Sequence, residues 1–263
     1  NRTLASDQGS EEWHAARDDI LTATSIAPIL GIGPRTIHDV FRDKTDLSQK
    51  FEGNEFTRFG TWVEPYVRRA YEMKNDVSIE EVGLIAHPNL KWLAASPDGW
   101  ITNEGALIEI KCTKSRILRS EPPSYYRIQC QTQLECVPEA KYCDLFEVKL
   151  EQQVSILQSD TSINTDWKMF IDDKGERWRI VDYKCHRIYR DSGWFDEIKS
   201  KLKLFWNDIN LAKNKRPSLK RKSSSEATTV TTTGRLGKHA KRVRRYSEDY
   251  ASYPTTQMCA YLS

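Results

Sequence analysis

Two carboxylates and a lysine lie close together in the middle of the sequence. The run Ser96-Pro97-Asp98-Gly99 is followed, ten residues further on, by Glu109-Ile110-Lys111. Mg²⁺ is commonly bound by one or two carboxylates together with water and substrate phosphate. A bound metal lowers the pKa of its water, and a neighbouring lysine orients the nucleophile or offsets the charge of the transition state. These residue types therefore predict a divalent-metal site for phosphodiester hydrolysis.

The elements around these residues must bring them to one edge of a sheet. Residues 106–112 form a short, apolar, β-branched run that is typical of a buried strand. Alternate residues of a strand share a face, so Glu109 and Lys111 point the same way. Asp98 lies at a turn or strand end, and a hairpin would place it beside Glu109. The competing interpretation is an ordinary turn followed by a solvated strand face.

Two helical stretches flank this motif. Apolar residues recur at helical spacing over 59–71, and Glu64 lies beside that stripe as either a boundary residue or a third metal ligand. Over 125–134, Gln129 and Gln133 are four residues apart and share a helix face. If this face is turned toward the core, the two glutamines need a polar partner there. The alternative interpretation is that the face is exposed to solvent.

The N-terminal segment holds a candidate anion site. Trp13 and Arg17 share a face if residues 12–17 are helical, and Thr22 or Thr24 would cap the helix that follows. A helix N-terminus beside an arginine binds anions. Simple capping would explain the threonines but not Arg17.

In this order, the motifs resemble those of the lambda-exonuclease and YqaJ-type viral recombinase nucleases, within the PD-(D/E)xK superfamily. The resemblance covers residues 11–207. Its parts are Trp13-His14-Ala15-Ala16-Arg17 with Leu21-Thr22-Ala23-Thr24, then Gly60 to Glu64, Ser96 to Gly99 with Glu109 to Lys111, Tyr126 to Gln131 and, more weakly, Ile188 to Asp191 before a helix that holds Trp194.

The resemblance implies an α/β fold with a restriction-endonuclease-like core, in which a central mixed β-sheet is flanked by helices. It implies that Asp98, Glu109 and the Ile110 carbonyl bind the metal, which would be Mg²⁺ with Mn²⁺ as a substitute. Glu64 would contact the metal directly or through water, and Lys111 would activate or orient the attacking water.

Further roles also follow only from the resemblance. Gln129, together with Gln131, would position the water, the lysine or the substrate DNA. Arg17, Thr24 and Ser96 match the arginine and two serines that bind the 5′-phosphate in the lambda enzyme. Thr24 departs from serine but keeps the hydroxyl group. Such a pocket implies 5′-to-3′ polarity.

Composition limits the class of protein. With 263 residues, 38% hydrophobic content and eight tryptophans, the chain has enough apolar material for one large domain or two small ones. It has no apolar stretch near eighteen residues and no visible signal peptide, so we expect an intracellular protein without a membrane partner. The six cysteines form no Cys-x-x-Cys pair, which disfavours structural zinc and predicts reduced, buried thiols. Because the chain begins with Asn rather than Met, we expect its N-terminus to be incomplete.

Residues 213–263 differ from the rest. They hold twelve Lys and Arg against three acidic residues, with many Ser and Thr, and are predicted to be a disordered tail after a nuclease domain over 1–212. Basic clusters over 213–222 and 238–245 would bind nucleic acid or direct nuclear import, while a solvated, inert tail is the alternative. We therefore expect a nuclear location if the source is eukaryotic, and a cytoplasmic or viral one otherwise.

A coarse layout follows from periodicity and turn residues. Helices are predicted over 11–18, 23–30, 36–44, 56–74, 124–136 and 193–211. Strands are predicted over 82–86, 91–95, 99–102, 106–112, 142–150 and 177–189. The polar stretch 151–176 contains a predicted turn at 172–175.

Together these features predict a Mg²⁺-dependent DNA exonuclease that acts on duplex ends in recombination or repair. A structure-specific or restriction-like endonuclease is the first alternative and would lack a closed 5′-phosphate pocket. A catalytically inactive nucleic-acid-binding module is the second, although the presence of Asp98, Glu109 and Lys111 disfavours it. Candidate partners are duplex DNA ends, a single-strand annealing protein and further copies of the chain in a ring.

Overall fold

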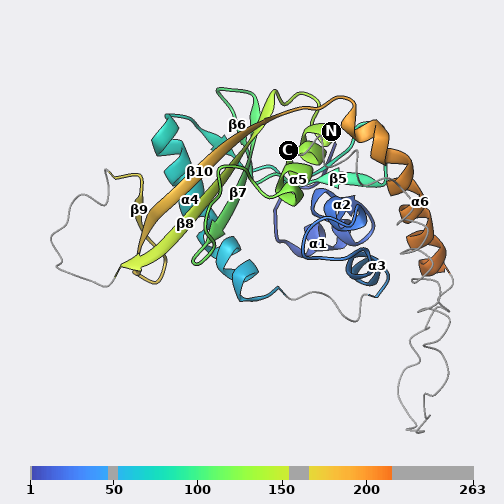
Figure 1. Cartoon of the computed structure of the whole chain (residues 1–263), viewed down its shortest axis with the longest axis horizontal. Coiled ribbons are helices and arrows are strands. Elements are labelled where there is room, and N and C mark those ends of the chain that lie inside the picture. Colours follow the sequence, from blue (N-terminus) through green and yellow to red (C-terminus); the bar gives the residue numbers. More distant parts are fainter. Residues whose placement is uncertain (1, 47–52, 154–165, 215–263) are drawn as a thin grey trace, which may run out of the picture. The chain divides into compact units, whose positions relative to one another are not determined.

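The computed structural model describes residues 2–46, 53–153 and 166–214 (Figure 1). The helices are α1 (Glu11–Asp18), α2 (Ala23–Ile29), α3 (Ile37–Thr45), α4 (Glu55–Asn75), α5 (Ser124–Cys136) and α6 (Trp194–Asn214). The strands are β1 (Thr3–Ala5), β2 (Leu21–Thr22), β3 (Ile79–Glu80), β4 (Leu84–Ala86), β5 (Leu93–Ala95), β6 (Gly99–Ile101), β7 (Ala106–Thr113), β8 (Tyr142–Gln153), β9 (Met169–Ile171) and β10 (Arg177–Tyr189).

The strands form two sheets. A six-stranded sheet has the order β3-β6-β7-β8-β10-β9, and a four-stranded sheet has the order β1-β4-β5-β2. In the larger sheet β7 and β8 are parallel, while the other neighbours are antiparallel. The long β8 and β10 strands cross the molecule in Figure 1, with helices packed around the sheet. The predicted α/β fold with a mixed sheet flanked by helices is confirmed.

Helix α4 covers one face of the larger sheet. Its first turn is capped by Asn54, whose side-chain oxygen accepts from the Thr57 amide at 2.8 Å. The predicted apolar stripe is buried, and it packs in one core cluster with Ile108 and Ile110 of β7. Burying side chains of this size stabilises a fold by about 1.5–3 kcal/mol each. This packing anchors β7 and leaves the alternate residues of β7 to face the opposite side.

Helix α5 carries polar side chains into the interior. Gln129, Thr132 and Gln133 are buried on it, next to the apolar Ile128 and Leu134. A buried amide must be hydrogen-bonded to avoid a large desolvation cost. The partners of the two glutamines lie on β7 and define the candidate site described below.

Most predicted elements are present within a few residues of their expected bounds. Strands β1, β2, β3 and β9 were not predicted, because runs of two or three residues are too short to show a period. Strand β8 continues to Gln153 because its ladder with β10 extends to the pair Gln153 and Arg177. The predicted turn at 172–175 is confirmed, with Gly175 at a φ of +80°.

The cysteines follow the prediction in part. Among the described residues, Cys130, Cys136 and Cys143 are buried and Cys112 is partly buried, all as free thiols. The prediction is wrong for Cys185, which is exposed on β10. Its strand alternates between covered and solvent-facing positions, so a thiol there need not be internal.

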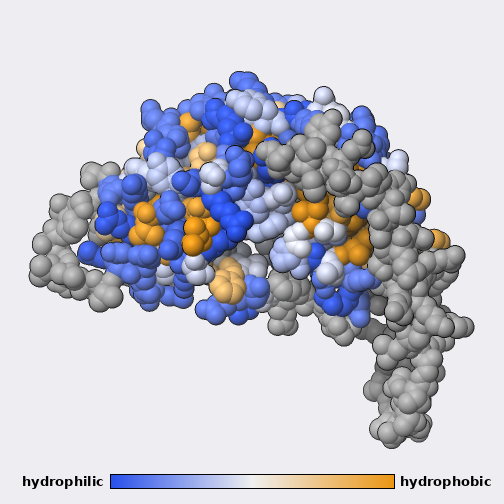
Figure 2. All heavy atoms as spheres, viewed as in Figure 1, coloured by the Kyte–Doolittle hydropathy of each residue, from blue (hydrophilic) through white to orange (hydrophobic). Residues whose placement is uncertain are grey.

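The described residues up to Asn210 form one compact unit. Because the chain beyond residue 214 lies outside the described residues, the domain boundary at 212, the disordered tail and its basic clusters stay predictions. No helix in the described part of the chain is long and apolar enough to cross a membrane. On the side shown in Figure 2, polar and charged residues cover most of the coloured surface, with smaller apolar patches between them.

Candidate active site

The β6–β7 hairpin places Asp98 against β7. The Asp98 amide donates to the Ile108 carbonyl at 3.1 Å, and the Ile110 amide donates to Asp98 Oδ2 at 2.7 Å. Asp98 is 7% exposed. Its carboxylate is therefore held at the strand segment that carries Glu109, as the predicted hairpin requires.

Gly99 makes this close approach possible. A Cβ atom at position 99 would lie 2.2 Å from the Ile79 side chain and 3.2 Å from that of Ile108. Contacts below 3.0 Å are essentially never found for real Cβ atoms. The glycine after Asp98 is needed because β3 and β7 pack tightly on both sides of it, and not because of a left-handed turn.

Glu109 is the centre of the site. It is 1% exposed and faces away from the core formed by Ile108 and Ile110. Its Oε1 accepts hydrogen bonds from the ammonium of Lys111 and, at 2.5 Å, from the amide of Gln129. Glu109 and Lys111 share one strand face, as strand alternation predicts, whereas the contact of Gln129 on α5 with Glu109 was not predicted.

The charges at this site are unbalanced. Burial, followed by the charges of Glu109 and Glu64, raises the pKa of Asp98 well above its usual range. Burial and the charge of Glu109 raise the pKa of Glu64 to about 7. Although burial opposes it, the charges of Glu109 and Asp98 raise the pKa of Lys111. Three carboxylates therefore repel one another, and Lys111 and Arg68 offset this repulsion only in part, an arrangement that a divalent cation would relieve.

This ligand set suits an oxygen-preferring cation. In the described part of the chain, no three His, Cys, Asp or Glu side chains lie close enough together to hold a metal by themselves. Mg²⁺ does not require such a cage, because it usually keeps several waters and takes one or two carboxylates with substrate phosphate. Asp98 and Glu109 supply two carboxylates, so the residues fit Mg²⁺ better than a structural metal.

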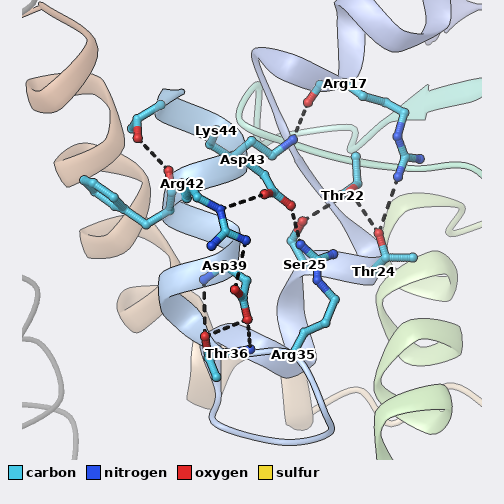
Figure 3. A network of polar contacts seen from close by, with 12 residues as sticks. Arg17, Thr22, Thr24, Ser25, Arg35, Thr36, Asp39, Arg42, Asp43 and Lys44 are labelled. Carbon is cyan, nitrogen blue, oxygen red and sulfur yellow. Dashed lines mark hydrogen bonds and ion pairs between the residues drawn. The ribbon is translucent and has the colours of Figure 1, made fainter. Parts of the chain in front are cut away.

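A second group of side chains, the Trp13 cluster, consists of Trp13, Arg17, Thr24 and Ser96. The Trp13 indole N–H donates to the Ser96 hydroxyl at 3.1 Å, and the Arg17 guanidinium lies 4.1 Å from the Trp13 ring centroid. Arg17 also donates to the Thr24 hydroxyl at 3.4 Å, as Figure 3 shows. The three residues predicted to bind a 5′-phosphate are thus linked to one another through Trp13.

The Trp13 cluster lies electrostatically close to the carboxylate site. Burial lowers the pKa of Arg17 to about 10, and the charge of Glu109 acts in the opposite direction. Ser96 also precedes Asp98 by two residues in the same chain segment. An anion bound at the cluster would therefore lie near the candidate metal ligands.

Gln131 lies apart from these groups. Its side-chain amide donates to the Tyr189 carbonyl at 2.7 Å, and its oxygen accepts from the Asp191 amide at 3.0 Å. The physical reason is helical geometry, since two residues rotate a side chain by about 200° around a helix with 3.6 residues per turn. The side chain of Gln131 therefore links the end of β10 to α5 by hydrogen bonds and points away from Glu109.

Three residues make contacts in the site although they were not among the predicted site residues. Gln133 donates to Glu109 Oε2, and Trp13 links the anion-binding candidates. The Tyr126 ring lies 5.2 Å from the Lys111 ammonium and 5.5 Å from the Arg116 guanidinium. Helical spacing did place Gln133 on the face of Gln129, so the signal for that residue was present in the sequence.

Comparison with known proteins shows which family and which solved structures this chain resembles. Residues 12–141 match the family model of the YqaJ-like viral recombinase domain, and this range contains both groups of side chains. Over these residues the chain is similar to a YqaJ-like viral recombinase domain. Its structure is similar to the crystal structure of an alkaline exonuclease, LHK-Exo, from Laribacter hongkongensis. The two are 27% identical, with a TM-score of 0.58, over 78% of this chain and 95% of LHK-Exo.

Two curated relatives are both named as uncharacterised proteins. Protein R354 of Acanthamoeba polyphaga mimivirus is 32% identical over 165 residues, which cover 56% of this YqaJ-like chain and 30% of R354. Protein YqaJ of Bacillus subtilis is 26% identical over 133 residues, which cover 48% of this chain and 42% of YqaJ. The chain thus spans less than half the length of these relatives.

Proposed function

We propose that this protein is a metal-dependent DNA exonuclease that removes nucleotides from the 5′ ends of duplex DNA, in recombination or repair. The observation that carries the proposal is the buried Glu109 carboxylate, paired with Lys111 and next to Asp98 and Glu64, where mutual repulsion favours a bound cation. The similarity to LHK-Exo, whose complex with dAMP has also been crystallised, supports a nuclease that acts on DNA.

Asp98, Glu109 and the Ile110 carbonyl would hold Mg²⁺, or Mn²⁺ in its place, with Glu64 contacting the ion directly or through water. When bound there, the ion supplies a water of lowered pKa and screens the charge of the phosphate. Lys111 places a positive charge beside Glu109, where it can orient the attacking water and stabilise the developing charge. Gln129 holds one oxygen of Glu109.

The Trp13 cluster would bind the 5′-phosphate of the DNA end. Arg17 provides a positive charge, and the hydroxyl groups of Thr24 and Ser96 can donate to phosphate oxygens. A pocket that requires a terminal phosphate selects ends over internal positions. Hydrolysis that leaves a 5′-phosphate on the shortened strand would then recreate the same substrate for the next round.

Digestion of linear duplex DNA tests this proposal. The substrates carry either a 5′-phosphate or a 5′-hydroxyl group, and each is incubated with Mg²⁺ or with EDTA. We expect cleavage that needs Mg²⁺, prefers phosphorylated ends and is reduced by about 10²–10³-fold in Lys111→Ala, as for the loss of a charge-stabilising group. Arg17→Ala should lose the preference for phosphorylated ends while some cleavage remains.

Closed circular DNA separates the alternatives. Cleavage of circular DNA, without a preference for ends, would show that the protein is a structure-specific or restriction-like endonuclease and not an exonuclease. DNA binding without cleavage in the wild-type protein would leave a catalytically inactive binding module. A single-strand annealing partner and a ring of several copies stay predictions, which co-purification and sedimentation would test.

A further inference from the structure

Gln133 and Cys143 form a buried polar pair behind Glu109. Gln133 is 0% exposed on α5, and its side-chain NH₂ group donates to Glu109 Oε2 at 2.5 Å. At its other end, Gln133 Oε1 accepts from the thiol of Cys143 on β8, with 3.5 Å between sulfur and oxygen. Two strands and a helix are therefore joined through a single amide.

The two contacts use both ends of the Gln133 amide. Its NH₂ group, which can only donate, faces Glu109, and its oxygen, which can only accept, faces Cys143. Burial, followed by the contact with the Cys130 thiol, raises the pKa of Cys143 well above its usual range, so Cys143 keeps its proton. A protonated thiol can donate to the amide oxygen, which holds the opposite end of Gln133 in place.

Together with Gln129, this pair holds both oxygens of Glu109. Gln129 donates to Oε1 and Gln133 donates to Oε2, from positions four residues apart on α5. A carboxylate held at both oxygens cannot rotate about its terminal bond without breaking a buried hydrogen bond. Metal ligands are commonly oriented in this way by residues that do not touch the metal.

We propose that Gln133 and Cys143 are positioning residues that hold the Glu109 carboxylate in the orientation in which it binds a divalent cation. Gln133 acts on Glu109 directly, and Cys143 acts through Gln133. This inference rests on the proposed metal-dependent function. It assigns a role to a thiol that composition alone would treat as a small buried hydrophobic residue.

Binding of Mn²⁺ to the full chain without DNA, measured by calorimetry, tests the proposal. Loss of an outer partner of a metal ligand typically weakens metal affinity by about 10–100-fold. We expect Gln133→Met to fall in this range and Cys143→Ala to lose about 3–10-fold, because it acts one step further away. Cys143→Ser keeps a donor and should stay within about 3-fold of wild type.

Cys136→Ala is the matched control, because Cys136 is also a fully buried thiol and lies on α5. We expect it to lower the midpoint of thermal unfolding but to leave Mn²⁺ affinity unchanged. Equal loss of affinity in Cys136→Ala and Cys143→Ala would reduce the effect to general packing and overturn the inference. Wild-type affinity in both Gln133→Met and Cys143→Ala would also overturn it.

The wild-type protein distinguishes this inference from the proposed function. If wild type neither binds Mn²⁺ nor cleaves DNA, the metal-dependent function fails and the inference fails with it. If wild type does both and the variants match it, only the positioning role is wrong.

Discussion

Replacing Glu64 with glutamine tests whether the carboxylates of the candidate site repel one another when no cation is bound. The pKa of Glu64 is about 7 in the folded protein, against 4.5 for the ordinary group. Between these values the folded protein binds more protons than the unfolded chain, so the free energy of unfolding falls as the pH rises. At about 1.4 kcal/mol for each pH unit, the full loss above pH 7 is about 3 kcal/mol.

Glu64→Gln cannot ionise and should escape this loss. We expect the variant and wild type to differ little near pH 4.5, and the variant to be more stable by about 1–3 kcal/mol at pH 8, since part of the repulsion is shared with neighbouring carboxylates. Urea denaturation in EDTA at both pH values measures the difference. For a chain of this size, each kcal/mol corresponds to about 2–4 °C in the unfolding midpoint.

A matched variant controls for the loss of one charge. Glu121 is 74% exposed and pairs with Arg127 at 3.5 Å, so Glu121→Gln should change stability by less than about 0.5 kcal/mol at either pH. If Glu64→Gln gives no more stability than Glu121→Gln at pH 8, or if its gain is the same at both pH values, the argument from mutual repulsion is wrong. Added Mg²⁺ should stabilise wild type more than Glu64→Gln.

Three other substitutions test further parts of the structure. Gly99→Ala would place a methyl group 2.2 Å from the Ile79 side chain, and should lower the free energy of unfolding by about 1–3 kcal/mol; an unchanged urea midpoint would contradict the tight packing. Tyr71→Phe removes the hydroxyl that donates to the buried Asp144 carboxylate at 2.6 Å. We expect it to cost about 1–3 kcal/mol of stability with normal DNA cleavage, and a loss of cleavage without a loss of stability would refute a purely structural role. Trp13→Phe removes an indole donor but keeps a ring, and should reduce the preference for 5′-phosphorylated ends by up to about tenfold; digestion assays that show an unchanged preference would place this hydrogen bond outside the end-binding pocket.

Local spacing in the sequence was sufficient to find the main chemical groups. Strand alternation placed Glu109 and Lys111 on one face, because side-chain direction in a strand depends only on position. The same reasoning placed Gln129 and Gln133 on one face of a helix. These inferences hold because period 2 and period 3.6 are properties of the backbone and do not depend on what packs against it.

Only the tertiary structure decided which groups meet. Trp13 and Ser96 are 83 residues apart in the sequence, and no local pattern reveals that they share a hydrogen bond. The fold also buries Glu109 near Asp98 and Glu64, and burial raises the pKa of Asp98 and of Glu64. Gln133, and not Gln131, reaches Glu109 because the fold turns the α5 face that carries Gln129 and Gln133 toward Glu109, while Gln131 bonds to Tyr189. Long-range contacts and the burial of charged groups depend on how the whole domain packs. No single segment of the sequence contains that information.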